Sequence, residues 1–580
     1  MLPRYLHAAL CAGASAGLLV GSAAALAQTT APGQTVPSQV TPQTLRPKTA
    51  PDDQAIVLPG SSATVPAAGN SSLTVEVGDV QMQDAFPDLA VASEAMIARV
   101  RYRKLSVAQI YAAASELERI YADAGYPLVR IVVPPQHLID HGQLRLVVVD
   151  GFIETIDVDR VPSRAQEAVA KRTASLVGRR HLKLVEIERS LLIAGDVPGL
   201  KLKSTLERGS REGGVRLLLE GGHDLVTGSI GIDDRLANSL GTWQLRGAVA
   251  LNNALGAGEQ VYATAGSAAN LKSVAAGISP LTIYGGGAIV PTGVDGVTIN
   301  PEYTHSTTRT TQTFGVPASL GTFERYALRL RAPISLTRKA SLYANFSLEE
   351  VDQQIAAPDF GVPLNHDHYR AFRAGTDYAT TLPWGTGMQL GAQMSMGLGG
   401  RNSFDAATSG IPLSRLGSGP DFAKLAASAH FSQPLPANLR VEVIAAGQFT
   451  GGKPMLRPEQ ITLDGNDAVS AFASGSFSAD QGLTLRGEVS RPFAIGSGGF
   501  NATVSPYVFG AAGRGWLANA TSVEQSVFDA GALGLGVRGT VQVAAGEPSP
   551  SLALEVGRGF TDLVGVKAGW RANMLASVTF

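Results

Sequence analysis

The chain has 580 residues, of which only 16% are charged, and its formal net charge is −1 at pH 7. This near-neutral balance argues against nucleic-acid binding, which needs a basic surface. The single cysteine, Cys11, lies inside a predicted signal sequence, so the rest of the chain can form neither a disulfide framework nor a cysteine metal site.

The N-terminus has the pattern of a secretory signal peptide, predicted at residues 1–27. Basic residues precede an apolar run that ends in the small-x-small cleavage pattern Ala25-Leu26-Ala27. An uncleaved inner-membrane anchor is the alternative, which the cleavage pattern disfavours. Residues 28–72 are rich in Pro, Thr, Gln, Ala and Ser and predict a flexible periplasmic linker. A short helix within this segment is the alternative. No later apolar run reaches the roughly 18 residues of a spanning helix, so a membrane would have to be crossed by strands.

Residues 73–150 predict a small α/β module. A helix that Ser106 caps carries Ile110, Leu117 and Tyr121 on one apolar face, and Gly125-Tyr126-Pro127 ends it. The predicted elements are a strand at 73–77, helices at 90–100 and 107–121, and strands at 128–133 and 144–149.

Residues 151–222 repeat this order of strand, helix, helix, strand, strand. The predicted elements lie at 152–158, 163–176, 185–193, 200–206 and 215–219. A repeated supersecondary unit indicates tandem copies of one module. Such modules commonly bind partners by adding a strand to an exposed sheet edge.

Beyond residue 222 the helical period disappears, and segments of about ten residues alternate between polar and apolar. Arg325 and Arg329, for example, alternate with Tyr326 and Leu328. This alternation predicts strands of a transmembrane barrel with an apolar outer face and a polar, water-filled interior. At roughly 20–24 residues per strand and connection, residues 223–580 predict an all-β antiparallel barrel of about 16 strands.

The last eleven residues predict the closing strand of an outer-membrane barrel. From Trp570 to Phe580 every even position is apolar, and a tilted strand needs about 9–11 residues to cross the hydrocarbon layer. A half-buried strand of a soluble sheet is the alternative. Trp570, Val578 and Phe580 are the candidate signal that the barrel-assembly machinery reads.

Three patterns that could carry chemistry have simpler explanations. Gly13-Ala14-Ser15-Ala16-Gly17 matches a nucleophile elbow but lies in the signal peptide. The glycines of 534–539 match a dinucleotide fingerprint but open no helix, and a crowded lumen or a neighbouring strand explains them better. His366 and His368 flank Asp367, yet on a strand the imidazoles and the carboxylate point to opposite faces. The sequence therefore predicts no catalytic residue, no metal site and no cofactor.

Two motifs in the modules carry a family resemblance. A Leu-rich helix leads into Asp196-Val197-Pro198-Gly199, and Gly125-Tyr126 precedes Pro134-Pro135-Gln136. Residues 231–259 form a third similar stretch at the start of the barrel. Together with the order of domains, these motifs resemble the outer-membrane transporters of two-partner secretion, the hemolysin and filamentous-hemagglutinin exporter family. Its periplasmic modules are called POTRA domains, and the resemblance covers nearly all of the chain after the signal peptide.

One family motif is altered in this chain. The family carries a loop folded into the barrel lumen, tipped by Val-Arg-Gly-Phe or Tyr, whose Arg is thought to pair with an Asp on an inner strand. By position the tip here is Val469-Ser470-Ala471-Phe472, so Ser470 replaces the Arg, and Ala511 replaces the Asp. A lone buried charge costs several kcal/mol, whereas removing both partners can be nearly neutral. The sequence therefore predicts a lumen loop without the family's ion pair.

The resemblance implies a passive protein-conducting pore in the bacterial outer membrane, with the POTRA modules in the periplasm. The modules would capture a large unfolded exoprotein, and a monomeric barrel would conduct it without ATP. Outer-membrane lipid and the barrel-assembly machinery are the other expected partners. The alternatives are a barrel-assembly factor of the same superfamily and a diffusion porin or adhesin. Deleting residues 73–222 would leave the function of a porin intact.

Overall fold

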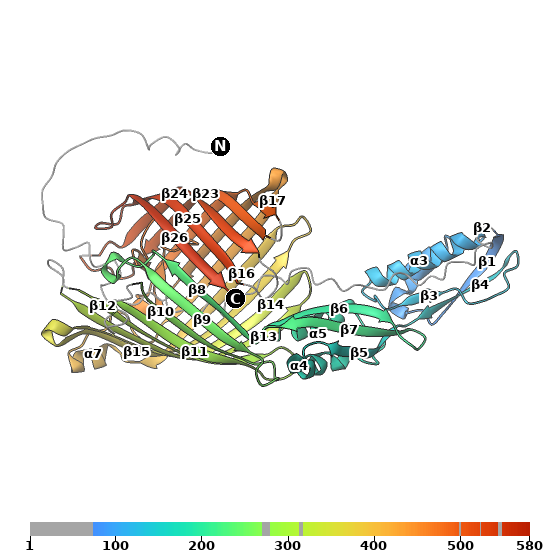
Figure 1. The fold of residues 1–580 in the computed structure, drawn as a ribbon, viewed down its shortest axis with the longest axis horizontal. Coiled ribbons are helices and arrows are strands. Elements are labelled where there is room, and N and C mark those ends of the chain that lie inside the picture. The colour runs from blue at the N-terminus through green and yellow to red at the C-terminus, as the bar shows by residue number, and fades with distance from the viewer. Residues whose placement is uncertain (1–72, 270–278, 312–316, 498–499, 523, 543–547) are drawn as a thin grey trace.

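The computed structural model describes residues 73–580 except 270–278, 312–316, 498–499, 523 and 543–547. The predicted signal peptide and linker lie outside these residues. Two small α/β modules precede a large barrel; the second module lies against one end of the barrel, and the first extends away from it (Figure 1). None of the helices within the described residues is long and apolar enough to cross a membrane.

The first module packs two helices against a four-stranded sheet of order β2-β1-β4-β3. Ser106 caps α3 as predicted: its hydroxyl accepts a hydrogen bond from the Gln109 amide nitrogen at 3.2 Å, and the Gln109 side chain accepts one from the Ser106 amide nitrogen at 2.8 Å. The sequence analysis missed β2, because four residues are too few to show alternation. The elements are β1 (Thr74–Gln83), η3 (Pro87–Leu89), α2 (Ala90–Ile97), β2 (Arg103–Ser106), α3 (Val107–Asp123), β3 (Arg130–Val132) and β4 (Gly142–Val149).

The second module repeats this arrangement in space, with a sheet of order β5-β7-β6. Its first strand pairs in parallel with its last, as β1 does with β4, and the remaining strand pairs antiparallel with the last. The elements are β5 (Phe152–Arg160), α4 (Ser163–Thr173), η4 (Ala174–Leu176), α5 (Leu184–Gly195), β6 (Leu200–Arg208) and β7 (Gly214–His223).

The rest of the chain forms the predicted barrel. β21 and β22 pair with consecutive stretches of β23, so they are one strand interrupted at Arg491-Pro492. On this count the described residues form a closed antiparallel barrel of 16 strands, which confirms the expected number. The strands are β8 (Val226–Asp233), β9 (Gln244–Asn252), β10 (Gln260–Ala268), β11 (Leu281–Pro291), β12 (Thr298–Thr310), β13 (Ser319–Leu336), β14 (Ala340–Ala357), β15 (Val362–Thr381), β16 (Gly387–Gly400), β17 (Ala423–Leu435), β18 (Leu439–Phe449), β21 (Gln481–Ser490), β22 (Phe493–Ser497), β23 (Phe500–Trp516), β24 (Val527–Gln542), β25 (Ser549–Thr561) and β26 (Trp570–Thr579).

Side chains along the strands alternate between the lumen and the outer surface. On β13, Arg325 is 9% exposed in the lumen, whereas its neighbour Tyr326 is 56% exposed on the outside. Arg325 and Arg329 both pair with the inward-facing Glu302 of β12, at 3.0 and 2.9 Å. The alternation read from the sequence is therefore the alternation between lumen and lipid.

The C-terminal residue closes the barrel. β26 pairs with β8 along Leu575–Thr579, and Phe580 extends the ladder with two backbone hydrogen bonds to Gly228, at 2.8 and 3.0 Å. A Cβ on Gly228 would lie only 2.6 Å from the Phe580 ring. The small residue on the first strand therefore makes room for the aromatic residue that ends the last one.

Candidate functional site

The candidate site is the loop of residues 450–480, which joins β18 to β21 and folds into the barrel lumen. It contains η8 (Arg457–Glu459) and two short strands that pair with each other, β19 (Ile461–Thr462) and β20 (Ser478–Ala479). The predicted tip, residues 469–472, lies in this loop. Its seat in the lumen combines apolar contacts, a polar anchor at the tip and a charged anchor at η8.

Apolar side chains pack the loop against the inner face of β23, β24 and β25. Phe472 and Phe477 are at most 5% exposed and belong to one buried cluster with wall residues. Phe477 stacks on Phe528 of β24 at 5.9 Å between ring centroids and meets Phe472 edge to face at 4.7 Å. Gly559 of β25 leaves space for the Phe472 ring, because a Cβ there would lie 2.6 Å from it.

The tip is anchored through Ser470. Its hydroxyl accepts a hydrogen bond from Arg486 Nη1 of β21 at 2.7 Å and donates one to Glu555 of β25. The same Arg486 pairs with Glu555 at 2.6 Å. Asn573 of β26 donates to the Ser470 carbonyl oxygen at 2.9 Å. Val469 and Ala471, on either side, are buried.

Further wall residues support this ion pair. Arg486 also pairs with Glu488 at 2.7 Å, and its guanidinium lies 4.0 Å from the centre of the Phe509 ring. Tyr507 donates to Glu555 at 3.0 Å. The Arg486 side chain, although 1% exposed, therefore has its charge matched and its donors used.

Sequence reasoning missed Arg486 and Glu555. The ion pair beside the tip is Arg486–Glu555, with both charges on the wall, and Ser470 contacts both partners. Alternation along β21 and β25 already points both side chains inward, which was the available signal. Their pairing across strands far apart in the sequence requires the closed barrel. Departure of the tip would leave this ion pair intact and would break the hydrogen bonds of Ser470 and the one that the Ala468 carbonyl oxygen accepts from Arg486.

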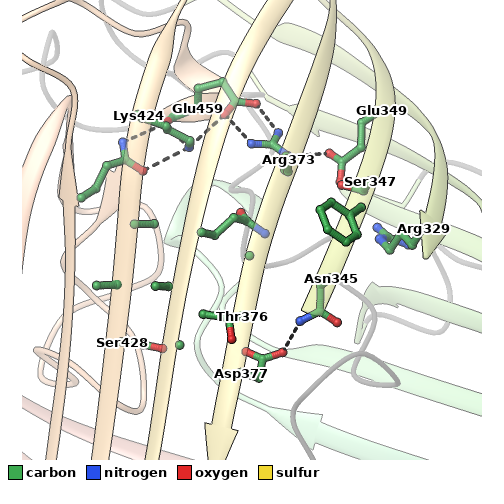
Figure 2. A pocket seen from close by; sticks show the side chains of 18 of the residues that line it. Arg329, Asn345, Ser347, Glu349, Arg373, Thr376, Asp377, Lys424, Ser428 and Glu459 are labelled. Atoms are coloured by element: carbon green, nitrogen blue, oxygen red, sulfur yellow. Dashed lines mark hydrogen bonds and ion pairs between the residues drawn. The ribbon is translucent and has the colours of Figure 1, made fainter. Parts of the chain in front are cut away.

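The charged anchor of the loop is Glu459 of η8 (Figure 2). Its carboxylate is 2% exposed and pairs with Arg373 of β15 at 2.7 Å and Lys424 of β17 at 2.9 Å. Burial opposes ionisation of Glu459, but the Arg373 guanidinium and the Lys424 ammonium outweigh it, so the pKa of this carboxyl is held well below its usual range. The loop is thus tied to β15 and β17 as well as to its apolar seat on β23, β24 and β25.

A second carboxylate of the loop, Asp464, organises the loop internally. Asp464 accepts hydrogen bonds from the backbone nitrogens of Gly475 at 3.1 Å and Phe477 at 3.0 Å, and so joins the two arms of the loop. Burial raises the pKa of Asp464 to about 6, against the two N–H groups, which favour the carboxylate. The nearby Arg235 acts in the same direction as those two groups.

Asp196 lies where the second module meets the barrel. Tyr343, near the start of the barrel strand β14, donates a hydrogen bond to the Asp196 carboxylate at 3.4 Å. Asp196 is the C-cap of α5, and Ile193 of that helix forms a buried apolar cluster with Leu336 and Tyr343. The motif that the sequence singled out therefore contacts the barrel directly.

Pro198 and Gly199 lie at the same junction. The Pro198 carbonyl oxygen is 3.1 Å from the His223 ring nitrogen, at the end of β7. Gly199 has a φ of +78°, and a Cβ there would lie 2.3 Å from the Asp224 carbonyl oxygen. Glycine is required here both by the backbone conformation and by the close approach of the chain leading to β8.

Gly125 and Tyr126 occupy the other junction, between the two modules. The Gly125 carbonyl oxygen accepts a hydrogen bond from the Leu184 nitrogen, at the start of α5, at 2.8 Å. Tyr126 donates to Asp88 at 2.6 Å and lies 5.6 Å below the Lys183 ammonium. The Gly125-Tyr126 motif thus connects the first module to the second, and the Asp196–Gly199 motif connects the second module to the barrel.

The remaining motifs have structural roles. Gly534 and Gly536 face the Phe509 and Tyr507 rings, and a Cβ at either would come within 2.5 Å of them. Asp367 points inward and accepts from the Ser414 nitrogen at 2.8 Å. Its two histidine neighbours pair with other acidic residues: His366 with Asp352 at 2.9 Å and His368 with Glu350 at 3.0 Å. Within the described part of the chain, no three potential metal ligands gather at one point.

Comparison with known proteins identifies the family. A model described as haemolysin secretion/activation protein ShlB/FhaC/HecB matches residues 217–539. The chain belongs to this family. A model of the ShlB-type POTRA domain matches residues 80–151 of the same chain. This member of the haemolysin secretion/activation family is an outer-membrane β-barrel with its POTRA region in the periplasm, as the sequence predicts.

Individual relatives are distant. CdiB from Escherichia coli shares the fold with a TM-score of 0.68 at 19% identity, covering 94% of each chain. CdiB from Acinetobacter baumannii has a TM-score of 0.60 at 16% identity, covering 93% of this chain and 95% of that one. The heme/hemopexin transporter protein HuxB of Haemophilus influenzae (strain 86-028NP) is 21% identical over 161 residues, which is 27% of this chain and 28% of HuxB.

Proposed function

We propose that this chain exports a large partner exoprotein across the outer membrane, in unfolded form and without ATP. The observation that carries the proposal is the lumen loop. The barrel closes through its own strands, so the loop contributes nothing to the wall. The polar anchor at Ser470 and the charged anchor at Glu459 hold the loop in the lumen. A loop of this kind can move and leave a continuous, polar-lined pore.

The periplasmic modules supply the receptor in this proposal. β2 and β3 are the edge strands of the first sheet, and β5 and β6 those of the second. An extended segment of the exoprotein can add to such an edge through backbone hydrogen bonds. The junctions at Gly125 and Asp196 hold these edges in line with the barrel entrance. Folding of the exoprotein outside the cell supplies the driving force.

Further partners follow from the architecture. Outer-membrane lipid surrounds the apolar outer face, and the barrel-assembly machinery inserts the chain after reading Trp570, Val578 and Phe580. The barrel is closed within one chain, so we propose a monomer.

Removal of the modules tests the proposal. A variant that lacks residues 73–222 should still insert as a barrel but should leave the exoprotein in the periplasm, as measured by immunoblotting of periplasm and medium. The unaltered full-length chain, expressed at the same level, serves as the control. Normal secretion by the deletion variant would contradict the receptor role of the modules, and normal secretion in cells that lack the chain would contradict the exporter function.

A further inference from the structure

A cavity of about 590 Å³ lies in the lumen beside η8 (Figure 2). Of its acidic lining residues, Glu349 and Asp377 belong to the wall, and Glu459 belongs to the loop. When the loop leaves, Glu349, Asp377 and Glu302, which pairs with two of the arginines, remain to balance five cations. The cationic lining residues are Arg325, Arg329, Arg331, Arg373 and Lys424.

The seat of Glu459 has the geometry of a carboxylate-binding site. Arg373 contacts both carboxylate oxygens, Oε1 at 2.7 Å and Oε2 at 3.1 Å. Lys424 contacts Oε2 at 2.9 Å, and the Tyr369 hydroxyl donates to Oε1 at 2.7 Å. A planar guanidinium that grips both oxygens, with an ammonium and a phenol beside it, is a strong and selective arrangement for a carboxylate.

The wall holds this arrangement without the help of the loop. Tyr369 and Arg373 lie on β15 and Lys424 on β17, and Glu349 of β14 fixes Arg373 through its Nε at 3.1 Å. Figure 2 shows the Arg373 side chain between Glu349 and Glu459. Withdrawal of Glu459 therefore vacates a preformed site.

We propose that Tyr369, Arg373 and Lys424 form a carboxylate-binding site in the channel wall, which Glu459 occupies at rest and acidic side chains of the translocating polypeptide occupy in turn. The proposal rests on the exporter function, since that function supplies the polypeptide. Glu459 then acts as an internal competitor: an acidic side chain that takes its place keeps the loop out. Successive acidic residues exchange at the site, because a conducting pore needs binding that is favourable but reversible.

Binding of a fluorescein-labelled hexaglutamate to the purified full-length protein in detergent micelles tests the site, with fluorescence anisotropy as the readout. Glu459→Ala removes the competitor while the Ser470 anchor remains, so it should lower the Kd for hexaglutamate about tenfold relative to the unaltered chain. Glu459→Ala with Arg373→Gln should reverse this gain. A labelled hexalysine should show no such gain in Glu459→Ala.

Arg329 provides the matched control. It lines the same cavity but pairs with Glu302 at 2.9 Å instead of Glu459. Glu459→Ala with Arg329→Gln should therefore bind hexaglutamate like Glu459→Ala alone. Equal losses from the Arg329 and Arg373 changes would show general lumen charge and overturn the site, as would no gain in Glu459→Ala. Glu459→Ala with Lys424→Gln repeats the test should the Arg373 variant fail to fold.

The two proposals fail separately. Site-specific binding of hexaglutamate, together with normal secretion in cells that lack the chain, would contradict the exporter function and keep the carboxylate site. Nonspecific binding by a chain whose module deletion blocks secretion would remove only the site.

Discussion

Arg486 shows how a single buried charge determines the way the loop is held. Its guanidinium is matched by Glu555 and Glu488 on the wall, and the loop contributes only the Ser470 hydroxyl. An arginine at the tip of the loop would leave with the loop and separate two buried charges, which costs several kcal/mol. Here both charges lie on the wall. Release of the tip therefore breaks hydrogen bonds to a neutral hydroxyl and separates no ion pair at this point.

This difference predicts unequal effects of two substitutions. Arg486→Gln leaves Glu555 buried without its cation and should lower the free energy of unfolding by about 3–5 kcal/mol. Ser470→Ala removes hydrogen bonds but keeps the ion pair, and should lower it by about 1–2 kcal/mol. Urea unfolding in lipid vesicles measures both values. Equal losses of unfolding free energy in the two variants would contradict this account, in which the wall alone balances the charge of Arg486.

At the scale of one element, residues 450–480 form a compact plug because both of its arms converge on Asp464. Asp464 is 7% exposed, and burial raises the pKa of its carboxyl to about 6. A group whose pKa is higher in the folded state stabilises that state while it is protonated. The stabilisation is complete below the ordinary value of 3.8 and is lost as the pH rises to about 6.

The loop should therefore be more firmly seated at pH 4 than at pH 7. A pKa raised from 3.8 to about 6 corresponds to about 3 kcal/mol. A spin label on Asn466→Cys, which is exposed beside the tip, should become more mobile between pH 4 and pH 6 and change little above that. Asp464→Asn in the same labelled chain should flatten this profile. An unchanged pH profile in Asp464→Asn would assign the effect to another group.

On the scale of the whole molecule, the family signatures lie at the joints. Gly125-Tyr126 connects the two modules, and Asp196-Val197-Pro198-Gly199 connects the second module to the barrel. The barrel is joined at its own seam by Phe580 and Gly228. The modules have buried cores of their own, separate from the barrel, so damage at the seam should not unfold them.

Deletion of Phe580 should consequently impair insertion of the barrel while both modules stay folded. The variant loses two backbone hydrogen bonds at the seam and the terminal aromatic residue that the assembly machinery is expected to read. The amount of heat-modifiable barrel in outer-membrane fractions measures insertion, and limited proteolysis of the periplasmic fragment measures module folding. Phe580→Tyr, which keeps the ring and both hydrogen bonds, is the control. Full insertion of the deletion variant would show that Phe580 is not needed for barrel assembly.

Local patterns were enough for the architecture. Alternating polarity identified the barrel and the strand that ends in Phe580, and three-and-four spacing identified α3, because each pattern reflects the geometry of one element on its own. The four-residue β2 was missed, since so short a segment has no period to read. The repeat of the two modules was visible for the same reason as the helices: each copy carries its whole pattern within a continuous stretch of sequence.

The anchors of the loop are of another kind. Arg486 meets Glu555, and Glu459 meets Arg373 and Lys424, across segments that are far apart in the chain and become neighbours only when the sheet closes around the loop. Alternation along their strands points Arg486, Glu555, Arg373 and Lys424 inward, whereas Glu459 lies on η8, where no such alternation exists. Which of them pair depends on the curvature of the barrel and the path of the loop through it, and neither is encoded within any single strand.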